Sequence, residues 1–251
     1  MKKILIAVKR VVDPNVVVRI KDDGSDVDTE FSKMSINPFD EHAIEEAVKL
    51  KESGFECEII AISIGGDKNV DTLRSALAKG CDRAILVNTS RNLEPINIAK
   101  ILKHFVEVEK PEIILLGKLA IDDDSNQTAQ MLAGMLNYPQ GTFISKLSLK
   151  SESIIEVERE VDYGIQKLEI SLPAVLSADL HLNQPRFVKL PQIMQAKKKP
   201  LETIELDSLN LDLPNYVELV QVFDGETKKQ CKFVNSVDEV VTILKSQGDR
   251  G

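Results

Sequence analysis

Four short runs of apolar, mostly β-branched residues alternate with amphipathic helical patterns through the first half of this 251-residue chain. The runs cover residues 4–8, 58–64, 83–87 and 112–116, and each has the length and composition of a fully buried strand. Strands separated by helices usually pair in parallel and are covered on both faces, with right-handed crossovers. The pattern therefore predicts an α/β fold with a doubly wound, mainly parallel, Rossmann-like sheet.

The helical patterns between these runs have recognisable ends. Asn37 can cap the first helix, Pro38 suits its first position, and Gly54 ends it. The second helix ends at Gly80, where a left-handed residue is favoured just before the next strand. A third helix is expected over about residues 95–108.

The pattern changes after about residue 140. Residues 154–160 and 166–172 alternate apolar and polar side chains around the turn at 162–164, which predicts a β-hairpin. A buried strand is expected at 173–177 and one late helix at 237–244. The expected division is an α/β nucleotide-binding domain over 1–182, a loop over 183–200 and a C-terminal arm over 201–251. The arm is too short to bury a core of its own, so it is expected to pack against another surface.

Composition excludes several classes of protein. A net charge of -8 and a pI near 5.1 disfavour nucleic acid and anionic lipid surfaces as partners. No apolar run approaches the roughly 20 residues that span a bilayer, so a soluble protein that is not secreted is expected. The three cysteines and three histidines share no spacing that predicts a disulfide framework, a metal site or a catalytic triad.

The loop after the fourth apolar run has the ingredients of an anion site. In parallel sheets ligands bind beyond the carboxyl ends of the strands, and Gly117 to Thr128 follows such an end and leads into a helix. Phosphate could bind there, or Asp122 to Asp124 could simply favour the start of the helix. A second loop, Ile64 to Asp67, has a superficial likeness to the glycine-rich loop of ATP pyrophosphatases. It lacks the flanking serines and follows the second strand instead of the first, so two glycines in a tight turn explain it better.

Several separate stretches together resemble one known family. They are Val157-Glu158-Arg159-Glu160-Val161-Asp162 with Gly164, Gln166 and Leu168; Pro173-Ala174-Val175-Leu176-Ser177; Ala7-Val8-Lys9-Arg10-Val11; Asn37-Pro38-Phe39; the 117–128 loop; Tyr138-Pro139-Gln140-Gly141-Thr142-Phe143; and Leu190-Pro191-Gln192-Ile193-Met194 with the lysines that follow. This ordered agreement is similar to electron-transfer flavoprotein beta subunits over most of the chain, and is weakest beyond residue 200. Tyr163 and Pro14 depart from the family pattern.

The resemblance implies a heterodimeric electron carrier without catalytic turnover of its own. In the family the alpha subunit holds most of an FAD site, and the beta subunit holds a buried AMP, so the expected fold is an adenine-nucleotide-binding one. Electrons arrive from acyl-CoA and related dehydrogenases and leave to a membrane quinone oxidoreductase. The implied location is the bacterial cytoplasm or the mitochondrial matrix.

Site residues are carried over one by one. The expected AMP contacts are Ala7, Asn37, Pro38, Phe39, Asp40, Ile64, Gly117, Lys118, Leu119, Ala120, Ile121, Asp122, Asp123, Asp124, Ser125, Asn126, Gln127 and Thr128. The 183–200 loop is expected to recognise dehydrogenases, and the leucine matching Leu190 is the family's anchor. The expected partner contacts are Leu190, Pro191, Ile193, Met194, Lys197, Lys198 and Lys199.

Two other functions share this fold. Bifurcating members of the family bind a second FAD where AMP would lie, but they carry a more glycine-rich loop than Asp122 to Asn126. A nucleotide-hydrolysing or stress-type binding protein is the other alternative, because fold alone does not decide function. The number of flavins in the purified complex distinguishes all three.

Overall fold

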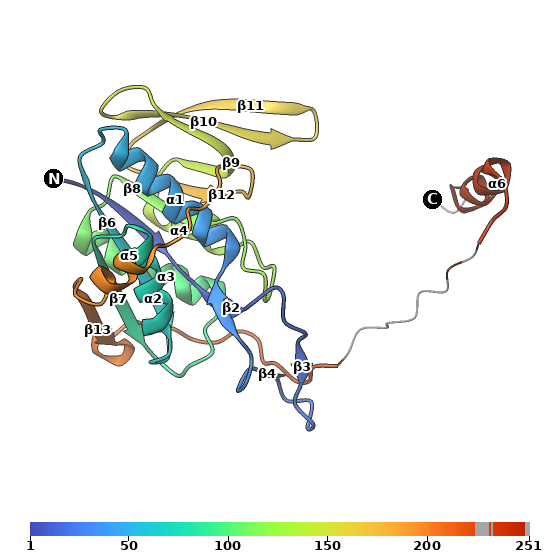
Figure 1. Cartoon of the computed structure of the whole chain (residues 1–251), viewed down its shortest axis with the longest axis horizontal. Helices are drawn as coiled ribbons and strands as arrows, with labels where there is room; N and C mark the ends of the chain where they lie inside the picture. Colours follow the sequence, from blue (N-terminus) through green and yellow to red (C-terminus); the bar gives the residue numbers. More distant parts are fainter. Residues whose placement is uncertain (224–230, 232, 249–251) are drawn as a thin grey trace. The chain divides into compact units, whose positions relative to one another are not determined.

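The computed structural model describes residues 1–223, 231 and 233–248 (Figure 1). The chain divides into two compact units. The first consists of residues 1–18 and 28–218, and the second of residues 19–27 together with the chain from 219 onward. The large sheet, its helices and every predicted site residue belong to the first unit.

Seven strands form the parallel part of a nine-stranded sheet in the first unit. In spatial order they are β9 (Gln140–Leu149), β12 (Ala174–Ala178), β8 (Ile113–Gly117), β1 (Lys2–Ala7), β6 (Cys57–Gly65), β7 (Arg83–Asn88) and β13 (Leu201–Glu205). Strand β1 pairs in parallel with β6 on one side and with β8 on the other. The four strands expected from the apolar runs are all present, which confirms the mainly parallel α/β fold.

Four helices cover the two faces of this sheet. Helices α1 (Pro38–Glu52) and α2 (Asn69–Lys79) pack on the face that carries Ile4 and Ile59, whereas α3 (Pro95–Glu109) and α4 (Thr128–Leu136) pack on the face that carries Leu5 and Ile60. The chain runs from β1 through α1 and α2 to β7 and then returns to β8 on the far side of β1. The crevice between β1 and β8 is therefore the point where the winding direction reverses, which is where ligands bind in open α/β sheets.

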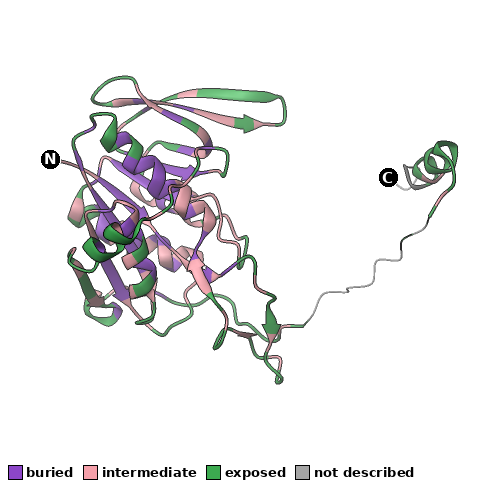
Figure 2. Cartoon of the chain, in the orientation of Figure 1, coloured by how far each residue is buried: buried purple, intermediate pink, exposed green. Residues whose placement is uncertain are grey.

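Beyond β9 the sheet becomes antiparallel. Strand β9 is parallel to β12 but antiparallel to β10 (Ile154–Val161), and β10 forms the predicted hairpin with β11 (Gly164–Ser171). The hairpin projects beyond the helices in Figure 1, and most of its outer strand β11 is exposed in Figure 2.

Two elements lie where the sequence predicted otherwise. A short helix, α5 (Leu190–Ala196), interrupts the expected 183–200 loop, because Pro191 suits a first helical turn and the Gln192 side chain accepts a hydrogen bond from the Lys189 N–H at 2.7 Å. Strand β13 then pairs with β7, so the boundary expected at residue 200 falls inside the domain's own sheet. The 3₁₀ helix η1 (Leu206–Leu209) follows it, and Leu206 and Leu213 are buried in the core of the first unit.

Smaller elements complete the described residues. Strands β2 (Arg10–Val12) and β5 (Met34–Ile36) pair antiparallel between β1 and α1, and β3 (Arg19–Ile20) pairs with β4 (Val27–Asp28). The second unit also contains α6 (Val237–Gly248), which confirms the predicted late helix. Among the described helices, none has the length and hydropathy to cross a bilayer.

Candidate functional site

The carboxyl ends of β1 and β8 are joined by one buried carboxylate. Oδ2 of Asp40 accepts a hydrogen bond from the Lys9 N–H at 2.8 Å, and Oδ1 accepts one from the Gly117 N–H at 3.0 Å. A Cβ at position 117 would approach Phe39 Cβ to 2.7 Å and collide with the Asp40 carboxylate, so only glycine fits there. Asp40 thus fixes the two sides of the crevice at the start of α1.

Burial dominates the electrostatics of Asp40. Desolvation raises the pKa of this carboxyl to about 7, although the N–H groups of Lys9 and Gly117 and the side chain of Asn37 each favour the ionised form. The group therefore titrates near neutral pH inside the crevice.

Asn37 orders the loop after β8 and does not cap α1 through its side chain. Its Nδ2 donates to the Leu119 carbonyl at 2.8 Å, and its Oδ1 accepts from the Ile121 N–H at 3.3 Å. The start of α1 uses the Asn37 backbone carbonyl, which accepts from the Asp40 and Glu41 N–H groups. The predicted capping role of this side chain is wrong because the neighbouring loop engages both of its polar atoms.

Lys9 neutralises the acidic part of that loop. Its ammonium lies 2.8 Å from Asp122 Oδ1 and 2.9 Å from Asp123 Oδ2. Burial alone would lower the pKa of Lys9, but the hydrogen bonds and attraction from Asp122 and Asp123 outweigh it, and the pKa is raised. Sequence reasoning missed Lys9, whose position two residues beyond a strand end was the available signal.

The first turn of α4 completes the crevice. The first N–H groups of any α-helix lack intrahelical acceptors, and within the described part of the chain no side chain caps those of α4. Gln130 donates from Nε2 to Asn126 Oδ1 at 2.9 Å, whereas its buried Oε1 has no partner among the described residues. Asp124 and Asn126 have φ values of 50° and 49°, so the loop turns sharply before the helix. Gln130 lies just beyond the predicted site and was also missed.

The residues predicted to contact the nucleotide therefore lie together, at the carboxyl ends of the parallel strands. Ala7, Ile64 and Gly117 are at or near the ends of β1, β6 and β8, Asn37 to Asp40 begin α1, and the remainder form the loop into α4. Lys118 points to the side of the crevice, where its ammonium lies 3.0 Å from Asp179 Oδ2 and 5.0 Å from the Phe143 ring centroid.

These groups fit an adenine nucleotide. Unpaired N–H groups at a helix start, a nearby ammonium and a cradle that only glycine allows suit a phosphate, and the free Gln130 oxygen can accept a hydrogen bond from an amino group. Because Lys9 pairs with two of the three loop carboxylates, their repulsion of a phosphate is reduced.

The predicted partner residues gather around α5, away from the crevice. Leu190, Ile193 and Met194 are 71%, 43% and 55% exposed, and Pro191, Lys197 and Lys198 are also exposed. Lys199 differs, because its ammonium donates to the carbonyls of Leu77 and Cys81 at the end of α2, at 3.0 and 2.7 Å. The Lys199 ammonium is therefore engaged within the chain, and its expected partner contact stays a prediction.

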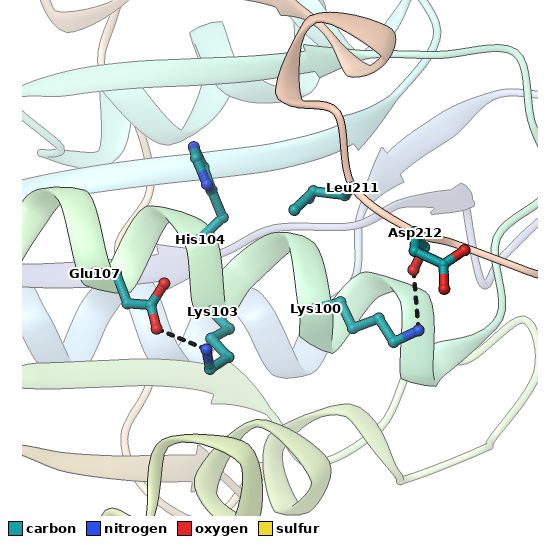
Figure 3. A pocket seen from close by; sticks show the side chains of 6 residues that line it. All are labelled: Lys100, Lys103, His104, Glu107, Leu211 and Asp212. Carbon is teal, nitrogen blue, oxygen red and sulfur yellow. Dashed lines mark hydrogen bonds and ion pairs between the residues drawn. The ribbon is translucent and has the colours of Figure 1, made fainter.

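A shallow pocket on the outer side of α3 is separate from both sets. It is lined by Lys100, Lys103, His104, Glu107, Leu211 and Asp212 (Figure 3). Lys103 pairs with Glu107 at 2.6 Å and Lys100 donates to the Asp212 carbonyl at 3.0 Å. With these charges already satisfied on an open surface, the pocket offers little to a ligand.

Known proteins are similar to this chain over nearly its whole length. Residues 27–209 match the electron transfer flavoprotein domain. The chain is 50% identical over 246 residues to the mitochondrial electron transfer flavoprotein subunit beta of Arabidopsis thaliana, which covers 98% of both chains. It is 47% identical to subunit beta of Bradyrhizobium diazoefficiens, with 98% of both chains covered, and 44% identical to that of Homo sapiens, again over 98% of both. The resemblance predicted from the sequence is confirmed, and the chain belongs to the family of electron transfer flavoprotein beta subunits.

Proposed function

We propose that this chain, an electron carrier subunit whose partner is the alpha subunit, holds an AMP and completes an FAD site formed mainly by alpha. In this proposal the heterodimer accepts electrons from acyl-CoA and related dehydrogenases and delivers them to a membrane quinone oxidoreductase. It works in a bacterial cytoplasm or a mitochondrial matrix. The observation that carries the nucleotide part is the crevice at β1 and β8, where Asn37, Asp40 and Lys9 order the loop into α4.

AMP in this crevice has a structural role in the proposal. The residues that would hold it come from β1, α1, β8 and α4, so a bound nucleotide would contact both sides of the crevice between β1 and β8. A ligand that binds only the folded state stabilises that state.

The partner part of the proposal rests on α5 and its surroundings. Residues 183–200 are called the docking segment below. Exposed apolar side chains framed by lysines are typical of a protein interaction surface, and Leu190 is the most exposed of the predicted anchors. We propose that this segment docks onto dehydrogenases.

The cofactor content of the purified heterodimer tests the nucleotide part. We expect one FAD by absorbance and one AMP by mass spectrometry of released nucleotides. The Lys9→Gln variant should retain several-fold less AMP, because Asp122 and Asp123 then face the phosphate uncompensated. Lys103→Gln, which removes an exposed ion pair on α3, is the matched control and should retain AMP normally.

Other results would contradict the proposal. Two flavins per heterodimer would indicate the bifurcating alternative, and no flavin would indicate a different nucleotide-binding function. Unchanged AMP content in Lys9→Gln would remove the assigned role of Lys9 in the crevice.

A further inference from the structure

The docking segment is attached to the domain at both ends. At its start, Asn183 Nδ2 donates to the His42 carbonyl at 3.0 Å and to Glu46 Oε2 at 2.9 Å. At its end, Arg74 Nη1 donates to the carbonyls of Ala196 and Lys199 at 2.8 and 2.7 Å. The exposed apolar residues lie between these two attachments.

Arg186 makes the strongest of these attachments. Its Nε and Nη2 donate to the two oxygens of Glu45 at 2.8 and 3.0 Å, and its Nη1 and Nη2 donate to those of Glu52 at 2.7 and 2.9 Å. Its backbone N–H also donates to Glu45 at 3.0 Å. One guanidinium is therefore bidentate to two carboxylates of α1, the geometry in which arginine binds most strongly and with the best defined orientation.

The burial of Glu45 shows that this arrangement is part of the fold. Its side chain is only 7% exposed, and a carboxylate is rarely so buried without a cationic partner. Glu52, two helical turns further along the same face of α1, is 59% exposed and binds the outer side of the same guanidinium. Arg186 is thus held from the domain side and from the solvent side.

The side chain that follows Arg186 is almost fully exposed to solvent. Phe187 is 93% exposed, and Leu190, Ile193 and Met194 follow it on the same segment. Val188 and Ala196, by contrast, pack against the core beneath. The backbone on either side of the exposed side chains is fixed, although those side chains have few neighbours of their own.

We propose that Arg186 is the positioning residue of the docking segment, which its paired contacts with Glu45 and Glu52 hold in the conformation that a dehydrogenase binds. This inference rests on the proposed docking function. A segment ordered in advance loses less conformational entropy on binding, so a complex with the same contacts is tighter. Arg186 contributes to affinity without touching the partner, while Leu190 contributes by contact.

The test compares Arg186→Gln with Leu190→Ala in the intact heterodimer, with an acyl-CoA dehydrogenase as the electron donor. Arg186→Gln should raise the carrier concentration that gives half-maximal transfer by about tenfold. The maximal rate at saturating carrier should stay unchanged, because the flavin environment is untouched. Backbone amides of residues 187–196 should exchange hydrogen faster in the heterodimer alone. Lys103→Gln is again the matched control.

Two milder variants keep the inference testable if Arg186→Gln folds poorly. Glu52→Gln removes only the exposed carboxylate and leaves the Arg186–Glu45 pair, so a smaller rise in the half-maximal concentration is expected. Arg186→Lys keeps the charge but cannot contact two carboxylates in a bidentate manner, so it should rescue only part of the loss.

The outcomes separate the two proposals. If Leu190→Ala raises the half-maximal concentration but the Arg186 and Glu52 variants do not, the positioning role is refuted and docking stands. If Leu190→Ala has no effect either, the docking function itself fails. A loss of maximal rate without a change in half-maximal concentration would also refute the positioning role.

Discussion

Asp40 shows how one side chain can serve two strands. Its carboxylate is the acceptor for backbone N–H groups at the ends of both β1 and β8, and it is almost completely buried. Both oxygens are therefore needed as acceptors at a position where burial opposes the negative charge. This conflict raises the pKa to about 7 and makes the crevice sensitive to pH.

The pH dependence of stability follows from the sign of this shift. Because the folded-state pKa of Asp40 lies above the ordinary carboxyl value of 3.8, the folded state binds the proton more tightly than the unfolded state does. The stabilising contribution of Asp40 is thus complete below about pH 4 and is lost as pH rises to about 7, by up to about 1.4 kcal/mol per pH unit.

Asp40→Asn removes this titration and tests it. Asparagine has a single acceptor oxygen, whereas the Lys9 and Gly117 N–H groups each donate to a separate oxygen of Asp40. One N–H group therefore loses its acceptor, and the variant should be less stable by about 1–3 kcal/mol. The difference in melting temperature between the native heterodimer and the variant should narrow as pH rises from 5 to 7. A difference that stays constant over this range would show that Asp40 remains ionised throughout.

Among the helices, α1 and α2 end differently although both are followed by glycine. Gly54 after α1 has φ 103° and would have no atom within 4 Å of an added Cβ. Gly80 after α2 has φ 137°, and an added Cβ would approach Val48 Cγ2 to 2.7 Å. The first glycine is required only for its backbone conformation, and the second also allows α1 and α2 to pack closely.

Alanine at the two positions separates these requirements. Gly54→Ala should destabilise the protein by about 1–2 kcal/mol, the cost of a left-handed backbone with a side chain. Gly80→Ala should cost about 1–3 kcal/mol more, because the core beside Val48 is overpacked. Thermal unfolding of the two heterodimers gives the comparison, and equal losses would contradict the packing role of Gly80.

The elements differ in how far the sequence predicts them. Buried strands such as β6 and helices such as α3 follow from local periodicity and end signals, and the structure confirms them. Strand β13 and helix α5 do not, since β13 has a mixed pattern and is an edge strand stabilised by its partner β7. Helix α5 is short and is held by Arg74 on α2, which is far away in the sequence.

The same limit applies to the crevice. The loop into α4 and the start of α1 could be located because ligand sites follow strand ends in parallel sheets. The pairing of Lys9 with Asp122 and Asp123 joins segments more than 100 residues apart, and no local pattern encodes it. Asn37 was misread for a related reason, since a residue with good capping chemistry also suits a distant loop.

In the molecule as a whole, exposed apolar side chains are concentrated after residue 215. Tyr216 and Val217 are 69% and 75% exposed in the first unit, where Glu94 Oε1 accepts hydrogen bonds from both of their N–H groups. Within the second unit, Val220, Phe223 and Phe233 are likewise exposed. Exposed apolar surface on one stretch supports the prediction that the C-terminal arm packs on another chain, and this packing stays a prediction.

Expression without the alpha subunit tests this expectation. The chain alone should be poorly stable or lack flavin, because the arm then has no surface to cover it and because our proposal assigns the main FAD contacts to alpha. A version that ends at residue 218 should aggregate less than the full chain alone but should form little heterodimer. A well-behaved full-length monomer with stoichiometric FAD would contradict both the arm's role and the shared FAD site.

The double attachment of the docking segment also bears on how such a carrier can change over evolutionary time. Arg74, Arg186 and Lys199 hold the backbone through groups on α1 and α2, whereas Phe187, Leu190 and Met194 contribute little to the core. Substitutions among the outward side chains should therefore cost little stability, whereas substitutions among the inward ones should cost more. Under the proposed docking role, a few changes of surface side chains on this fixed backbone would be enough to change the electron donor.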